Sequence, residues 1–217
     1  METAQQHIAT PNQGSLWHSI AGKLLALFNP MTMVVLMSIF VMCGWASPLS
    51  FPPQLSSFVV LTVAFMVVGI PLATYGLMHL LGIGGKQESG QRRRRRMMFL
   101  VVALCLAGCG RIYSGVIVLF LMRKVLYTAS LLTVVLWVFE LLFPLAKNSF
   151  GSGALLAMMW MLLYVGNLAL LVPFTIVLIM AGLLATLHIY TTHTPLWREM
   201  LSLLVGFAFG AIIFIMV

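Results

Sequence analysis

The sequence predicts an all-α protein, a polytopic transmembrane bundle of six to seven spanning helices preceded by a short interfacial helix. Of the 217 residues, 62% are hydrophobic and 7% are charged, and the mean hydropathy is +1.09, whereas about 25% of residues are charged in soluble domains. The length leaves room for six or seven helices of about 20 residues each. Long apolar runs exclude a β-barrel, whose strands alternate inward-facing and outward-facing residues.

The longest polar run, Gly84–Arg96, reads GGKQESGQRRRRR and separates two apolar segments that are each long enough to cross a bilayer. Each arginine costs about 2.5–3.5 kcal/mol at the centre of a spanning helix on insertion scales. We therefore expect residues 84–96 to form a cytoplasmic basic loop, which fixes the side of every other loop.

The chain before this loop is expected to enter the membrane through an interfacial helix. Residues 1–14 are polar and predicted to be disordered, without the basic-then-apolar pattern of a cleaved signal peptide. Residues 15–28 predict an amphipathic helix lying in the membrane plane, capped by Ser15. Asn29-Pro30 then marks a break, and residues 29–217 are expected to form a single transmembrane domain.

Seven crossings are expected within this domain, with Pro71 kinking the second. Their approximate ranges are 31–46, 55–81, 97–121, 125–145, 154–171, 173–190 and 196–217. For the third crossing an alternative is open, since Arg111–Gly115 could equally be the turn before the fourth.

This topology satisfies the positive-inside rule with the N-terminus in the cytoplasm. Nine basic residues fall on the inner side and three on the outer side. The inner set is Lys23, Lys86, Arg92–Arg96, Lys147 and Arg198, and the outer set is Arg111, Arg123 and Lys124. The arginine loop and the polar stretches 147–153 and 190–198 are all expected on the inner face.

Four short features carry a family resemblance across residues 29–217: Asn29-Pro30, the arginine loop, the N-x-x-G-x-G pattern of Asn148–Gly153, and AGLLATLHIYTTHTP ending at Pro195. In this order and spacing the chain resembles the type-2 phosphatidic acid phosphatase superfamily, in particular its small Bacteroidetes-type membrane relatives. The resemblance implies a bacterial inner-membrane location and a lipid-phosphate ligand.

The resemblance also implies a degenerate catalytic set. His193 matches the nucleophilic histidine of the superfamily's S-R-x5-H-x3-D motif, but Leu187 and Trp197 stand where the arginine and the aspartate belong. Asn148 stands at the histidine of the P-S-G-H motif. Arg96 matches the arginine of K-x6-R-P, but no proline follows it. Because the loss of one such group costs 10²–10³-fold in rate, we expect a non-catalytic protein.

The expected function is therefore that of an anionic-lipid or isoprenoid-phosphate binding or scaffold subunit. Its headgroup-binding residues would be Lys86, Arg92, Arg93, Arg94, Arg95, Arg96, Lys147 and Asn148. One alternative is a divergent lipid-phosphate phosphatase that uses His193. A second alternative is a small transporter with a polar cavity around Arg111 and Glu140. The arginine tract could also be a topology anchor only, and His193-Thr194-Pro195 a turn that starts a helix.

Glu140 is predicted to be paired, because an acidic residue at membrane depth is normally paired or functional. The expected intramembrane charge pair is Arg111 with Glu140, and Lys147 is the other possible partner. Gly206 and Gly210 form G-x-x-x-G, which permits close approach of a helix from the same chain or from another copy.

The expected partners are anionic membrane lipids, with a membrane-protein partner or a homo-oligomer also possible. Although the formal charge is +8, nearly half of the basic charge is one juxtamembrane cluster, so lipid headgroups are favoured over nucleic acid. No cofactor is expected. No metal site is expected either, because the chain has no aspartate and no third ligand is evident beside His188 and His193.

Overall fold

The computed structural model describes residues 30–42, 52–80, 88–116, 119–142, 146–164, 171–192 and 194–217. The side chains of Pro30, Met31, residues 88–95 and Leu142 fall outside this description. Throughout the described ranges the regular structure is helical and contains no strand, which confirms the all-α class. The predicted disordered N-terminus and interfacial helix lie outside the described residues.

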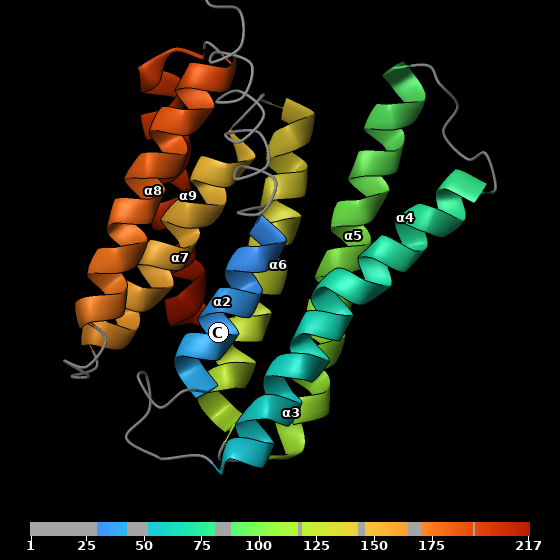
Figure 1. Ribbon diagram of the computed structural model, residues 1–217, viewed down its shortest axis with the longest axis vertical. Coiled ribbons are helices and arrows are strands. Elements are labelled where there is room, and N and C mark those ends of the chain that lie inside the picture. Colours follow the sequence, from blue (N-terminus) through green and yellow to red (C-terminus); the bar gives the residue numbers. More distant parts are fainter. Residues whose placement is uncertain are drawn as a thin grey trace, which may run out of the picture.

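The helices run up and down the molecule, with α3 and α4 continuing one another in a single direction and the other consecutive helices running antiparallel (Figure 1). In order they are α2 (Pro30–Met42), α3 (Pro53–Ala64), the π-helical turn η1 (Phe65–Gly69), α4 (Ile70–Leu80), α5 (Glu88–Ile112), the 3-10 turn η2 (Tyr113–Gly115), α6 (Phe120–Leu142), α7 (Lys147–Tyr164), α8 (Leu171–Thr192) and α9 (Leu196–Met216).

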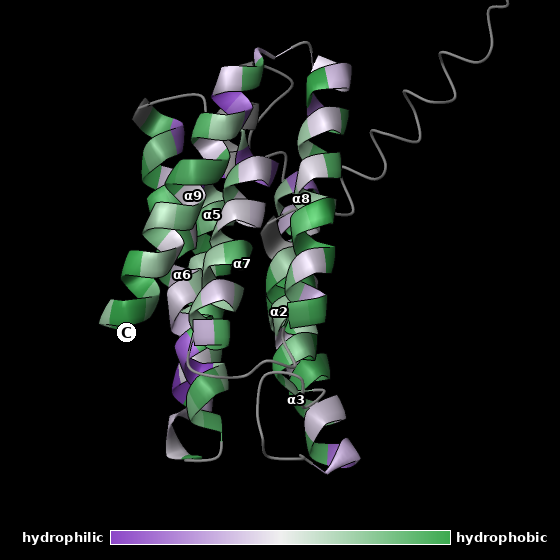
Figure 2. Ribbon diagram, turned by 90° about the vertical axis from the view of Figure 1, so that its left-hand side faces the viewer, coloured by the Kyte–Doolittle hydropathy of each residue, from purple (hydrophilic) through white to green (hydrophobic). Residues whose placement is uncertain are grey.

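Five helices within the described ranges are long and apolar enough to cross a membrane. They are Pro53–Leu80, Arg96–Gly115, Phe120–Leu141, Leu171–Thr192 and Leu196–Met216. Hydrophilic residues gather mainly toward helix ends, and hydrophobic residues cover much of the length between them (Figure 2). The described apolar part of α2 is Thr32–Met42. The chain is therefore a membrane protein with at least five candidate spans.

The second predicted crossing is one long rod made of α3, η1 and α4 (Figure 1). The π-helical turn Phe65–Gly69 ends just before α4, whose second residue is Pro71. Proline has no backbone N–H to complete the hydrogen bonding of the preceding turn, and single π turns are a known cause of helix kinks. The irregular turn thus lies where the sequence predicted a kink.

The turn between the third and fourth crossings lies at the alternative position. Helix α5 ends at Ile112, and the 3-10 turn Tyr113–Gly115 follows it. The expected continuation to residue 121 is therefore wrong. Arg123 and Lys124 lie instead near the start of α6. Each cation lies over an aromatic ring, a favourable contact. The Arg123 guanidinium carbon is 5.1 Å from the Phe120 ring centroid, and Lys124 Nζ is 4.9 Å from the Phe214 ring centroid.

The fifth helix begins seven residues earlier than expected. Helix α7 starts at Lys147 rather than Ala154, so the glycines of the predicted loop lie inside its first two turns. Every residue from Ser152 to Met159 is buried. A helix that is buried on all sides occupies the centre of a bundle, and α7 has this position.

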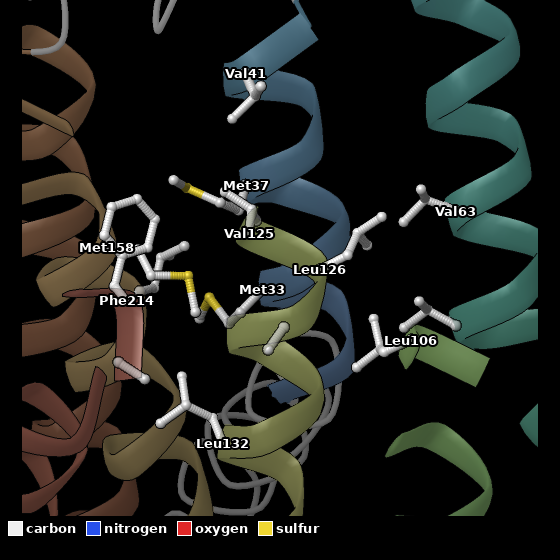
Figure 3. Packing of buried hydrophobic residues seen from close by; sticks show 14 of the residues in the cluster. Met33, Met37, Val41, Val63, Leu106, Val125, Leu126, Leu132, Met158 and Phe214 are labelled. Atoms are coloured by element: carbon white, nitrogen blue, oxygen red, sulfur yellow. The ribbon is translucent and has the colours of Figure 1, made fainter. Parts of the chain in front are cut away.

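The hydrophobic core joins α7 to the neighbouring helices. Met33 and Met37 of α2 and Val125 of α6 are buried, and these side chains lie with Met158 of α7 in the same layer (Figure 3). On the other side of α6, Leu126 lies toward Leu106 of α5 and Val63 of α3 (Figure 3). Figure 3 thus shows α6 packed on both sides. This core holds together the helix ends that carry the polar groups.

Candidate functional site

The three polar stretches that were expected to share a face do lie at one end of the bundle, which we call the polar end. It comprises the first turns of α5, α7 and α9 and the last turns of α6 and α8 (Figure 1). Two contacts join these helices near this end. The backbone N–H of Ala146 donates to Ser202 Oγ at 3.1 Å, and Lys147 Nζ lies 4.8 Å from the ring centroid of Phe99 on α5.

A buried carboxylate, Glu199, is the centre of the hydrogen-bond network at this end. Ser149 Oγ donates to Glu199 Oε2 at 2.5 Å, and Thr194 Oγ1 donates to Glu199 Oε1 at 3.0 Å. Oε1 also lies 2.6 Å from Nδ1 of His188. Only 1% of Glu199 is exposed, so these three partners replace its hydration shell. Glu199 thereby connects α7, α8 and the first turn of α9.

Sequence reasoning did not identify Glu199 as a site residue. The one signal was its rarity, since Glu199 is one of only four acidic residues in the chain. Two of its three partners are 50 and 11 positions away, a separation that no local pattern reveals, and the third, Thr194, is five positions away. Within the described residues no third His, Cys, Asp or Glu joins His188 and Glu199 in a metal-ligand cluster. The network therefore supplies orientation and charge compensation between helices.

The second carboxylate, Glu140, pairs with Lys147 and not with Arg111. Lys147 Nζ lies 2.5 Å from Glu140 Oε1, while Arg111 lies exposed near the C-terminal end of α5. Glu140 is 20 positions after the start of α6, about 30 Å along the helix, so the antiparallel arrangement places the two residues at opposite ends. The predicted Arg111–Glu140 pair is therefore wrong, and the Lys147 alternative is right.

This separation also removes the premise of the transporter alternative. A midplane cavity lined by both Arg111 and Glu140 is incompatible with their positions at opposite ends of the α5–α6 hairpin. A pocket of about 40 Å³ lies between α2, α6 and α7. Most of the residues that line it are apolar, among them Met33, Leu136 and Phe150. Thr133, its polar side chain, already donates to the Ala129 carbonyl.

The polar end is held by close packing between α7 and α9, which run parallel. A Cβ atom added to Gly153 would lie 2.2 Å from the Leu203 carbonyl oxygen, and one added to Gly206 would lie 2.2 Å from that of Phe150. At Gly210 it would lie 2.9 Å from Ala157 Cβ. The partner of the G-x-x-x-G pair is thus α7 of the same chain. Glycine is required here because the two backbones touch.

The predicted headgroup residues are distributed unevenly over the described parts. Lys147 and Asn148 are the first two residues of α7, and both are half-buried. Arg96 is half-buried on α5, three residues before Phe99. The backbone of Arg92–Arg95 continues α5 toward its N-terminus. Lys86 and the predicted catalytic residue, His193, lie outside the described residues.

The charges at the polar end do not balance. The acidic residues of the whole chain are Glu2, Glu88, Glu140 and Glu199. Glu140 is paired with Lys147, and Glu199 is hydrogen-bonded to His188. Near the five arginines in the sequence, the acid is Glu88 alone. An excess of positive charge therefore remains on the first turns of α5, which is the electrostatic condition for attracting anions.

Comparison of the chain with known protein families, with characterised proteins and with solved structures finds no match. The resemblance to type-2 phosphatidic acid phosphatases thus remains a hypothesis drawn from the sequence.

Proposed function

We propose that this protein binds anionic or isoprenoid-phosphate lipid headgroups at its polar end without hydrolysing them. In this proposal the chain crosses a bacterial inner membrane seven times, with the polar end and the N-terminus in the cytoplasm. The observation that carries it is the charge imbalance: both carboxylates described inside the bundle, Glu140 and Glu199, have partners within it. Five arginines stand in a row at this end of the chain with Glu88 as the one acidic residue near them in the sequence, and lipid headgroups are the groups we propose to compensate them.

Membrane lipids are the compensating groups that fit this position. The apolar run of α5 begins at Met97, directly after the arginines, which would place the arginines at the depth at which a bilayer presents its headgroups. A basic residue near an anionic membrane surface contributes about 1 kcal/mol to association, and the contribution falls off within a Debye length. Five such residues together would give the protein a strong preference for anionic over zwitterionic lipid.

The argument against phosphoryl transfer is the incomplete cationic cradle. A histidine nucleophile that attacks phosphorus needs cationic groups for the phosphate oxygens, and the sequence has Leu187 where the superfamily motif has an arginine. The hydrogen bond between His188 Nδ1 and Glu199 does not count against catalysis, because a carboxylate in this position orients an imidazole. The phosphatase alternative is therefore tested directly through His193.

The proposal is tested by the lipids that the purified protein retains. The protein would be reconstituted in nanodiscs containing equal amounts of phosphatidylcholine and phosphatidylglycerol, and the lipids bound after brief detergent extraction would be counted by native mass spectrometry. We expect enrichment of phosphatidylglycerol, and loss of that enrichment when Arg92–Arg96 are all replaced by Gln. A pair of variants matched in charge, R92Q/R93Q and R123Q/K124Q, compares the two ends; we expect the larger loss of enrichment from R92Q/R93Q, because Arg123 and Lys124 lie over the rings of Phe120 and Phe214.

Two results would overturn the proposal. One is an anionic-lipid preference that the arginine replacement does not alter. The other is release of phosphate from phosphatidate or an isoprenoid diphosphate that disappears in H193A, because that result would establish the phosphatase alternative. Running both assays on one preparation separates a binding protein from an enzyme.

A further inference from the structure

Arg96 lies on a helix, at the point where the arginine tract meets the packed part of the bundle. Helix α5 begins at Glu88, so the second half of the expected basic loop 84–96 is helical, and that expectation is wrong on this point. Arg96 is half-buried, and among the described residues its guanidinium has no hydrogen-bond or ion-pair partner. One turn further along α5, the ring centroid of Phe99 lies 4.8 Å from Lys147 Nζ. Arg96 therefore has donors available to a ligand, close to a second cation.

The register of α5 against α6 brings Arg96 to the level of Trp137. Ser130 Oγ on α6 donates to the Ala103 carbonyl of α5 at 2.8 Å, and the two helices are antiparallel (Figure 1). Arg96 and Trp137 are each seven residues from this bond toward the polar end, about 10 Å along the helix axis. Seven residues return to nearly the same face of a helix, so both residues lie on the faces with which α5 and α6 pack.

Two buried polar atoms on α6 are unsatisfied near this level. Trp137 Nε1 and, three residues later, Glu140 Oε2 are buried, and neither has a hydrogen-bond partner within the described residues. The other carboxylate oxygen of Glu140 is bound by Lys147. Buried donors and acceptors are almost always satisfied, so a donor and an acceptor on neighbouring turns point to a ligand with a hydroxyl. The side chains of Glu140 and Lys147 are 19% and 26% exposed, which leaves this place open to the outside of the bundle.

We propose that the polar end binds the headgroup of a single lipid between α5, α6 and α7, and that this headgroup is a phosphodiester with a free hydroxyl. Arg96 and Lys147 donate to its phosphate. Trp137 Nε1 donates to its hydroxyl oxygen, and the same hydroxyl donates to Glu140 Oε2. This inference rests on the proposed function and names its ligand class, of which phosphatidylglycerol is the simplest member.

The charge of the site selects a phosphodiester over a phosphomonoester. Two cations, Arg96 and Lys147, and one carboxylate, Glu140, give the site a net charge of +1. A phosphodiester carries about −1, whereas a phosphomonoester carries about −1.5 to −2 near neutral pH. The carboxylate repels the additional charge of the monoester. The site therefore favours phosphatidylglycerol over phosphatidate and over isoprenoid phosphates.

Competition between lipids tests the site. The full chain would be placed in nanodiscs of phosphatidylcholine with equal amounts of phosphatidylglycerol, phosphatidylmethanol and phosphatidate, and the retained lipids counted by native mass spectrometry. Phosphatidylmethanol is a phosphodiester without the hydroxyl, so its comparison with phosphatidylglycerol isolates the contacts to Trp137 and Glu140. We expect about tenfold more phosphatidylglycerol than phosphatidylmethanol, because the hydroxyl bonds to a charged group. Phosphatidate should also be retained less than phosphatidylglycerol.

Three variants separate the roles of the side chains. W137F keeps an aromatic ring but removes the N–H, and it should lower the ratio of phosphatidylglycerol to phosphatidylmethanol about threefold. E140Q removes the repulsion of a second charge and should raise phosphatidate relative to phosphatidylglycerol. R96Q should lower both phosphodiesters together, and R123Q, which removes the same charge at the opposite end, should lower them less. An unchanged lipid ratio in both W137F and E140Q would contradict the site.

Other outcomes would also overturn it. Equal retention of phosphatidylglycerol and phosphatidylmethanol would mean that water satisfies Trp137 and Glu140. Displacement of the lipid by an excess of glycerophosphoglycerol would mean that the ligand is a soluble phosphodiester. The two proposals fail differently: if replacing Arg92–Arg96 leaves the anionic enrichment unaltered, lipid binding itself fails. Equal retention of the two phosphodiesters, both above phosphatidylcholine, rejects the hydroxyl site and leaves lipid binding in place.

Discussion

The packing of α7 on α9 makes a prediction with a built-in control. A Cβ atom at position 206 would lie 2.2 Å from the Phe150 carbonyl oxygen, 0.8 Å inside the 3.0 Å limit that real Cβ contacts respect. Because the obstructing atom is backbone, the two helices must separate along their contact, and the bonds from α9 to Ser149 and Ala146 are strained with them. Overpacking of this kind costs about 1–3 kcal/mol.

The matched control is Gly182→Ala on α8. Gly182 is exposed, and an added Cβ would meet nothing within 4 Å. The helix-propensity gain of about 1 kcal/mol for replacing glycine with alanine applies to both sites, so the comparison isolates the packing cost. We expect G206A to lower the free energy of unfolding in lipid bicelles, measured by steric trapping, and G182A to leave it unchanged or raise it. Equal stability of the two variants would refute backbone contact between α7 and α9.

Three further predictions concern the polar groups and the kink. Replacing Glu199 with Ala should cost about 1–3 kcal/mol of unfolding free energy, because His188 and two hydroxyls lose a buried hydrogen-bond partner; an unchanged free energy in the same unfolding assay would contradict the network. Exchanging the charges as E140K/K147E should recover part of the stability lost in each single variant, and a purely additive thermal shift would argue against the pair. P71A should allow the π turn to become regular α-helix, and an unchanged spin-label distance between the ends of α3 and α4 would show that Pro71 does not maintain the kink.

The sequence predicted the features that depend on hydropathy and charge. Apolar length defined the helical class, and the arginine tract together with the polar turns at Lys147 and Arg198 predicted which loops share an end. These signals are strong because hydrocarbon tolerates neither unpaired backbone nor charge. Pro71 also predicted the irregular turn, because the absence of a proline N–H can be read from a single residue.

Features that depend on contacts between distant helices could not be predicted. Gly151 and Gly153 indicated a loop because glycine is common in turns, but in α7 the glycine at 153 permits contact with α9. To choose between Arg111 and Lys147 as the partner of Glu140, one had to know that α5 ends at Ile112, which places Arg111 at the opposite end of the α5–α6 hairpin. Glu199 passed unnoticed because its meaning comes from Ser149 and His188, which the fold alone brings to it.

The dependence of α7 on α9 has a consequence for how the protein is made. Helix α7 carries two polar residues at its start, and it packs closely on α9, which follows it in the sequence. During synthesis α7 therefore lacks this contact until α9 has been made. Loss of α9 would uncover Gly153 and Ser149, which α9 buries in the complete fold.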